Sequence, residues 1–367
     1  MISFVILFVI EFLFSILLFQ RIKTIKLKLL MAGCSVIHIL ATILYIQLAH
    51  LTNADALSYY DQALRATSWL ETWGEGTNFI IYFLYPWVNW IGFDFILSFL
   101  PFSCIGLYGH YLIIRVLESK YEIKWSPFYL IILLPQLHFW TCAIGKDAII
   151  FASISYLIFY WKISPKRLLP FAIALSTIGI IRAHILFILS IGFMIYLFFK
   201  LKTKKSVALT IMLTIGIFLL IPTVTQRVGL REGENLEEYF ERAQTHNQDG
   251  GSSVNMSNAN IAEKVFSYIA RPMFFDANNA FLLEASFENV IWAYMFLFYL
   301  LHPFRAARTD YFFIFILLLL VNSYILTNLG ISMRQKTMLF PFLFLGFLDL
   351  KNKISKNGKN IIYSTNR

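Results

Sequence analysis

The chain has 367 residues, of which 58% are hydrophobic and only 14% are charged, whereas charged residues make up roughly 25% of an ordinary soluble domain. This composition excludes an ordinary soluble globular protein and predicts a core buried in lipid. The formal net charge of +10 does not indicate a nucleic-acid partner, because the basic residues are distributed among short loops between apolar runs. We therefore expect an all-α, polytopic transmembrane helical bundle.

The amino-terminal part begins with two apolar runs that are each about as long as a membrane span, Met1–Phe19 and Leu29–His50. The positive cluster follows the first run instead of preceding it, which favours an uncleaved anchor with its amino end outside. After a polar loop, Leu51–Asn78, the apolar stretch Phe79–Ile114 is too long for one span and short for two. We predict an interfacial or re-entrant helix there, followed by one full span.

Two further apolar stretches, Pro127–Trp161 and Leu168–Phe199, are too long for one helix, and each carries charged residues near its middle. Ionisable residues are costly inside hydrocarbon. We therefore predict that each stretch is a hairpin of two short helices, with tips at residues 145–147 and 182–184. Further spans are predicted at Ser206–Ile221, Val290–Leu301, Tyr311–Thr327 and Thr337–Leu348, which brings the total to about eleven.

The predicted organisation has four parts: membrane helices at 1–222, a polar loop at 223–289, membrane helices at 290–350 and a basic tail at 351–367. Within the loop, Glu234–Asn247 has the pattern of an amphipathic helix, and Asp249–Ser253 has that of a linker. A second helix, Ile261–Ala270, is expected to end before Pro272. We interpret the loop as a partly helical lid.

The positive-inside rule fixes the orientation, because most Lys and Arg residues fall in the short loops on one side of this arrangement and in the tail. The amino end is therefore expected outside and the carboxyl end in the cytoplasm. The large loop and both hairpin tips then lie on the extracytoplasmic face, together with most residues that could carry chemistry.

Candidate acids and bases come from three places. Asp55 and Tyr59 share a helix face just after the second span, where Asp55 could accept a proton and Tyr59 could contact substrate; the alternative is a solvated helix with an interfacial aromatic anchor. Asp147 follows Lys146 at the first tip, and these two could instead simply stabilise the turn. Histidine as a residue type titrates near neutrality, so His184 at the second tip could move a proton, although an isolated histidine is more often a packing residue.

Candidate anion-binding residues are cationic and are expected on the same face: Lys146, Arg182, Arg231, Arg271 and Arg334. Arginine presents a planar donor fork that matches phosphate oxygens. Arg271 is expected to be well positioned because Pro272 ends the preceding helix. Arg231 could instead serve only as an anchor to lipid phosphate.

The sequence resembles bacterial polysaccharide-repeat polymerases and related multispanning glycosyltransferases of the GT-C-like kind. The resemblance is carried by Asp55–Tyr60 with Gly76–Phe79, Pro135–Asp147, Gly251-Ser-Ser leading to Ala270-Arg271-Pro272, and Asn328–Pro341. It implies transfer of a glycan from an undecaprenyl-pyrophosphate carrier to an acceptor sugar, in the bacterial cytoplasmic membrane. Other envelope-polysaccharide assembly proteins are implied as partners.

The same resemblance implies roles for the candidate residues. Arg182, Arg271 and Arg334 would offset charge on the leaving pyrophosphate, and Asp55 or His184 would deprotonate the attacking hydroxyl. The chain lacks the paired Asp-Asp or Glu-Asp motif after its first span, and no metal ligands or cofactors are expected, with a divalent cation left as an open alternative. The competing hypotheses are a flippase of a lipid-linked oligosaccharide and a non-enzymatic assembly partner.

Overall fold

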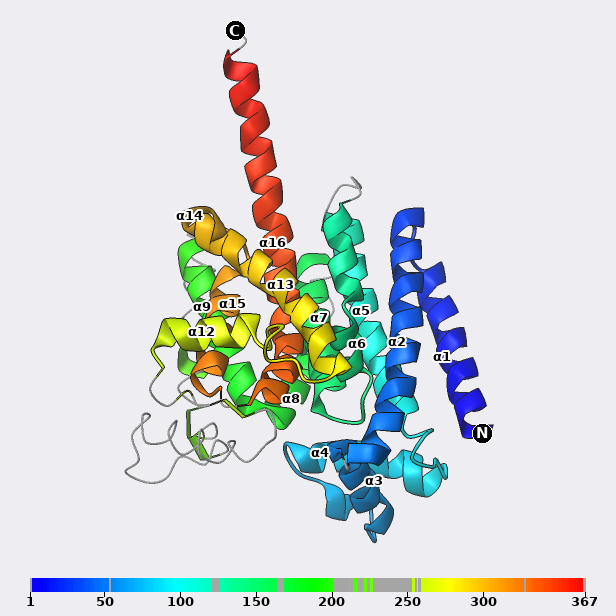
Figure 1. Ribbon diagram of the computed structural model, residues 1–367. Helices are drawn as coiled ribbons and strands as arrows, with labels where there is room; N and C mark the ends of the chain where they lie inside the picture. Colours follow the sequence, from blue (N-terminus) through cyan, green and yellow to red (C-terminus); the bar gives the residue numbers. More distant parts are fainter. Residues whose placement is uncertain are drawn as a thin grey trace. The chain divides into compact units, whose positions relative to one another are not determined.

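The computed structural model describes residues 2–52, 54–120, 126–163, 168–200, 259–326 and 328–365, together with short pieces between 211 and 256. The described part is helical apart from turns and one isolated antiparallel bridge between Ser253 and Asn328 (Figure 1). The predicted span Ser206–Ile221 is described only in part. The predicted helix Glu234–Asn247 and Arg231 lie outside the described residues.

The chain forms two compact units, Met1–Arg182 and Ala183–Arg367. The long helices of the first unit are α1 (Ile2–Gln20), α2 (Ile25–Thr52), α5 (Phe99–Lys120), α7 (Lys146–Ile163) and α8 (Leu168–Ile181). Shorter elements connect them: α3 (Asp55–Arg65), η1 (Leu70–Thr72), α4 (Thr77–Tyr85), the π-helix η2 (Pro86–Trp90), the 3-10 helix η3 (Pro127–Leu133) and α6 (Pro135–Thr141). Helix α3 packs on α4 and on the end of α2 (Figure 1).

Helix α5 is the centre of the first unit, where it packs against α1, α2, α6 and α7. Two glycines allow this close approach. A Cβ atom at Gly106 would lie 1.9 Å from the carbonyl oxygen of Thr141 on α6, and one at Gly109 would lie 2.7 Å from the Phe151 ring on α7. Small residues at helix contacts let backbones approach closely, as is common in membrane proteins.

The second unit contains α9 (Ala183–Lys200), α12 (Ile261–Ala270), α13 (Ala280–Leu301), α14 (Pro303–Ala306), α15 (Phe312–Tyr324) and α16 (Leu329–Thr365). Helix α15 packs against α9, α12 and α16, and α13 packs against α12 and α16. Helix α12 has the bounds predicted from the sequence. It begins with a capping box in which Asn260 and Glu263 bond each other's backbone N–H groups.

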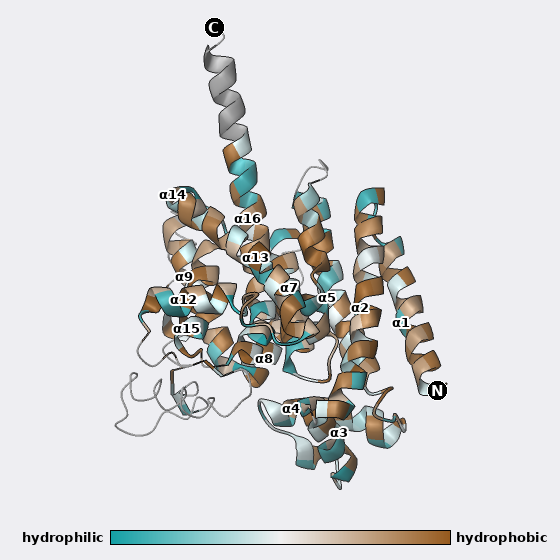
Figure 2. Cartoon of the chain, viewed as in Figure 1, coloured by the Kyte–Doolittle hydropathy of each residue, from teal (hydrophilic) through white to brown (hydrophobic). Residues whose placement is uncertain are grey.

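Four helices among the described residues are long and apolar enough to cross a membrane: α1, α2, α5 and α13. Figure 2 shows hydrophobic residues along most of α1 and α2. Large apolar side chains of α1, such as Phe8 and Leu13, are about half exposed. This is the pattern of a membrane protein.

The prediction of about eleven spans is wrong, because several apolar runs form helices too short to cross hydrocarbon alone. The apolar helices α8, α9 and α15 have fewer than 18 fully described residues. Part of the apolar sequence is also covered by protein instead of lipid, as on α16, where the residues from Met338 to Leu348 are buried.

Candidate functional site

In the first unit, two of the predicted site residues form an ion pair although they are 35 positions apart. Arg182 donates from Nη2 to Oδ1 of Asp147 at 2.8 Å, and both side chains are largely buried. Asp147 lies in the first turn of α7, where a carboxylate is stabilised by the positive end of the helix dipole. Arg182 directly follows the last residue of α8. The pairing therefore joins the start of one helix to the end of another.

Lys146 lies beside this pair as the first residue of α7, and the start of α4 approaches it. Gly76, the residue before α4, has a φ of +61° and donates its N–H to the carbonyl oxygen of Ile180 at 3.0 Å. A Cβ atom at Gly76 would lie 3.7 Å from Nζ of Lys146. This region thus brings Lys146, Arg182 and Asp147 together with the amino-terminal ends of two helices. Such an arrangement favours an anion.

The remaining predicted site residues are distributed over other elements. Asp55 is the exposed first residue of α3, and Tyr59, one turn later, is buried. In the second unit, His184 is exposed in the first turn of α9, and Arg334 is half-buried on α16.

In the second unit, Arg271 is held at the end of α12 by Asp276. Its Nε donates to Oδ2 at 2.9 Å and its Nη2 donates to Oδ1 at 2.5 Å, so the pair is bidentate. Oδ2 also accepts the backbone N–H of Met273. The hydrogen bonds from Arg271 hold the pKa of Asp276 below its ordinary value, and the same contact raises the pKa of Arg271. The guanidinium group is therefore fixed in direction.

Arg271 lines an open hollow of about 600 Å³ in the second unit. Most of its lining is apolar and includes Met256, Phe266, Met273 and Phe275. Phe266 and Phe275 remain 55% and 79% exposed. A hollow with an oriented guanidinium group and an apolar lining suits a ligand that has a negative head and a greasy chain.

Lys336 on α16 fixes the backbone on which Arg271 stands. Although it is charged, it is only 4% exposed. Its Nζ donates to the carbonyl oxygens of Ile269 and Arg271, at 3.1 and 3.2 Å, and to Oδ1 of Asn289 on α13. Glu288, also buried, interacts with it electrostatically. Lys336 thereby links α16, α13 and the end of α12.

This role of Lys336 was not predicted from the sequence, because the bundle partners of a lysine cannot be identified from its neighbours in the chain. The available signal was a lysine directly before the apolar run Thr337–Leu348. Ionisable residues at that depth usually face the interior of a bundle and have a partner there.

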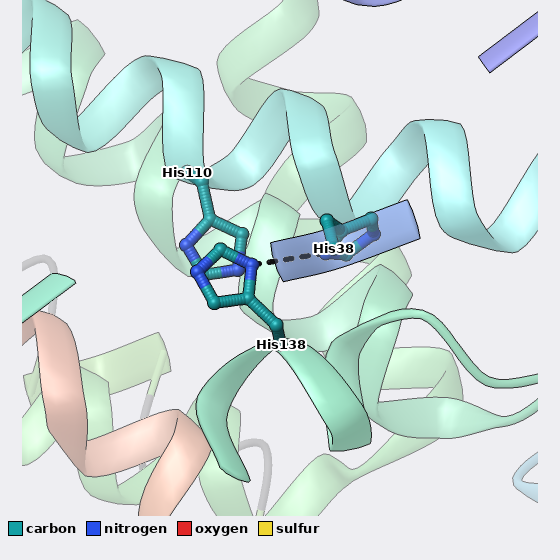
Figure 3. Close-up of side chains that lie close together, drawn as sticks. All are labelled: His38, His110 and His138. Carbon is teal, nitrogen blue, oxygen red and sulfur yellow. Dashed lines mark hydrogen bonds between the residues drawn. The ribbon is translucent and has the colours of Figure 1, made fainter. Parts of the chain in front are cut away.

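Three buried histidines of the first unit form a second feature that was not predicted from the sequence (Figure 3). His38 comes from α2, His110 from α5 and His138 from α6, and each is fully buried. One ring nitrogen of each lies within 4.8 Å of the others. The signal in the sequence was a histidine near the middle of each of the apolar helices α2 and α5, with a third on the short helix that packs between them.

Comparisons with known proteins give no assignment. No protein-family model, no curated protein and no solved structure matches this chain.

Proposed function

We propose that this protein is a membrane glycosyltransferase that acts on a glycan linked to polyprenyl pyrophosphate, of the polysaccharide-polymerase kind. The proposal depends chiefly on one observation: Arg271 is fixed in direction at an apolar hollow. A guanidinium group binds pyrophosphate oxygens, and the aromatic and methionine side chains beside it suit the polyprenyl chain.

The geometry of Arg271 leaves donors for such a ligand. A guanidinium group has five N–H donors, and Asp276 takes two of them. Within the described residues no other side-chain hydrogen bond of Arg271 is present. Asp276 therefore acts as an orienting partner, and three N–H groups are available to phosphate oxygens.

In the transfer step, the bond between the anomeric carbon of the donor sugar and the pyrophosphate oxygen breaks. A hydroxyl oxygen of the acceptor sugar forms the new bond to that carbon, and its proton passes to a base. His184, which is exposed in the same unit as Arg271, is the proposed base, and Asp55, exposed in the first unit, is the alternative. The leaving group is polyprenyl pyrophosphate, whose charge Arg271 offsets, and Arg334, Arg231 and Tyr59 are proposed as further substrate contacts.

The cations of the first unit are a separate candidate anion site in this proposal. Lys146 is the first residue of α7, and Arg182, which directly follows α8, bonds Asp147. We propose that they contact the anionic part of the substrate.

We further propose that the protein resides in the bacterial cytoplasmic membrane as a multi-pass protein with its amino end outside. Its spans would include shorter apolar helices such as α8, α9 and α15, in addition to the four helices of full length. Helices shorter than about 20 residues can contribute to a bundle where protein or a cavity replaces lipid. The polyprenyl-linked glycan, membrane lipids and envelope-polysaccharide assembly proteins are the proposed partners.

A flippase of a lipid-linked oligosaccharide is the second candidate, and the buried polar groups of the first unit favour it. Glu11 on α1 is only 2% exposed, and the three histidines lie near the middle of the unit's helices. Transporters place ionisable groups at such a depth.

An assay with purified protein in liposomes separates the two functions. The liposomes contain a polyprenyl-pyrophosphate-linked repeat unit on one leaflet. Products that lengthen by whole repeat units support the transferase, whereas unchanged substrate that appears in the other leaflet supports the flippase. Arg271→Ala should abolish lengthening, and Lys353→Ala, an exposed cation on α16, should not. Full activity of Arg271→Ala in folded protein would refute the proposed role of the hollow.

A further inference from the structure

The three-histidine cluster of the first unit is an unusual feature for the interior of an apolar bundle. The rings of His38, His110 and His138 converge from three helices and are completely buried (Figure 3). His38 and His110 lie near the middle of α2 and α5, two of the helices long enough to cross a membrane. A polar group at that depth is costly unless it is paired or functional.

The hydrogen bonds of the cluster determine the tautomers of two rings. Nε2 of His38 lies 3.0 Å from the carbonyl oxygen of Ser103, and Nε2 of His138 lies 3.0 Å from the carbonyl oxygen of Ile132. A carbonyl oxygen only accepts, so both Nε2 atoms carry a hydrogen. In a neutral imidazole the other nitrogen, Nδ1, then carries a lone pair.

These two lone pairs face each other. Nδ1 of His38 lies 3.2 Å from Nδ1 of His138 (Figure 3). Two neutral rings with these tautomers cannot form a hydrogen bond, because neither Nδ1 atom has a proton to donate. The contact is favourable only when a cation is shared by the two nitrogens.

His110 brings a third ring with an incomplete set of partners. Its ring is stacked on that of His138, with centroids 4.0 Å apart. Nε2 lies 3.1 Å from Oγ1 of Thr141, and that hydroxyl bonds the carbonyl oxygen of Leu137. Nδ1 of His110 is buried and has no hydrogen-bond partner among the described residues.

We propose that His38, His110 and His138 form a site for one transition-metal ion of the class that prefers imidazole, such as Zn²⁺. Two nitrogens bound to the same tetrahedral Zn²⁺ at about 2.0–2.1 Å are roughly 3.4 Å apart, close to the separation of the two Nδ1 atoms. The third nitrogen starts from separations within 4.8 Å, and it reaches that geometry when the His110 ring turns out of its stack on His138.

The surroundings match those of a histidine metal site. A ligating histidine usually donates its other N–H to a backbone carbonyl or a carboxylate, which orients the ring. The carbonyl oxygens of Ser103 and Ile132 accept these bonds from His38 and His138. The main competing cation is a proton shared by His38 and His138, and that arrangement does not need His110.

The test uses the full-length protein in detergent after treatment with a chelator. Co²⁺ is added as a spectroscopic substitute for Zn²⁺, and the visible ligand-field bands are recorded. We expect saturation at one Co²⁺ per chain with the intensity of a tetrahedral site, and displacement by Zn²⁺. His110→Leu should weaken binding by at least about 100-fold, because it removes a ligand. His50→Leu, on the same helix as His38 but exposed, should bind as the wild type does.

The wild-type titration decides the matter even if a variant does not fold. Absence of saturable Co²⁺ and Zn²⁺ binding to wild type would overturn the proposal in favour of the shared proton. Binding that survives in a folded His110→Leu protein would overturn the three-histidine site. Both results are independent of glycan transfer.

Discussion

Replacing Lys336 with methionine tests whether this residue holds the backbone of Arg271. Methionine keeps the length and volume of the side chain but removes every hydrogen bond made by Nζ. The carbonyl oxygens of Ile269 and Arg271 and the amide oxygen of Asn289 then lose a buried charged donor. Glu288 also loses a compensating charge.

Two effects oppose each other in this substitution. Each orphaned buried acceptor costs about 1–3 kcal/mol, so three cost about 3–9 kcal/mol. Removal of the buried ammonium recovers several kcal/mol of desolvation, but losing one partner of a buried charged set typically destabilises by about 3–5 kcal/mol. We therefore expect a net loss of about 3 kcal/mol and a Tm lower by roughly 6–12 °C.

The assay is thermal unfolding in detergent, followed by binding of undecaprenyl pyrophosphate at a temperature where both proteins are folded. Lys353→Met is the matched control, because Lys353 lies on the same helix, is exposed and likewise donates to a backbone carbonyl oxygen, that of Arg308. The control should change Tm little. If Lys336→Met and Lys353→Met have equal Tm values and equal ligand affinity, Lys336 does not position Arg271.

Three further predictions concern packing, pH and the first unit. Gly106→Ala should lower the free energy of unfolding by about 3 kcal/mol or more, because the new Cβ atom would collide with the backbone of Thr141. Gly33→Ala is the control and should cost little, because its Cβ atom would meet only the end of the Leu133 side chain, at 3.2 Å. Chemical denaturation of both variants measures the difference. Because Arg271 lowers the folded pKa of Asp276, the contribution of this pair to stability is present above the ordinary carboxyl pKa of about 3.9 and is lost as pH falls through the lower folded value. Asp276→Asn should therefore flatten the acid dependence of Tm below about pH 4, and an unchanged slope there would contradict the pairing. Asp147→Ala should destabilise the wild-type protein more than it destabilises the Arg182→Ala protein, because only in the wild type does it leave a buried arginine without its carboxylate. Additive losses of stability in this double-mutant cycle would count against the ion pair.

The local features of this fold follow from the sequence more readily than its span count does. The bounds of α12 were predicted from its helical composition and from Pro272, which ends it, whereas the capping box at Asn260 is visible only in the structure. The number of spans was not, because hydropathy does not distinguish a lipid-crossing helix from an apolar segment covered by protein. The apolar run before Lys146 forms a 3-10 helix and the seven-residue helix α6, and no length rule for regular helices anticipates that break.

The candidate sites show the same difference between local and long-range information. Arg271 and its proline neighbour were identifiable from local sequence, and Asp276 is only five residues away. The partners of Lys336 and the convergence of His38, His110 and His138 require the tertiary fold, since the histidines are separated by 72 and 28 positions. Arg182 and Asp147 were each predicted at a break between helices, but their ion pair is visible only in the folded chain.

The most direct test of the proposed function is the affinity of the purified protein for undecaprenyl pyrophosphate, measured beside undecaprenol, which has the same chain without the charged head. We predict that the wild type binds the pyrophosphate more tightly than the alcohol. Arg271→Ala should lose about 10- to 100-fold of the affinity for the pyrophosphate, as expected for one charged hydrogen-bonding group, with little effect on the alcohol. Equal affinity of the wild type for both lipids, or an Arg271→Ala protein that binds the pyrophosphate as the wild type does, would contradict the account.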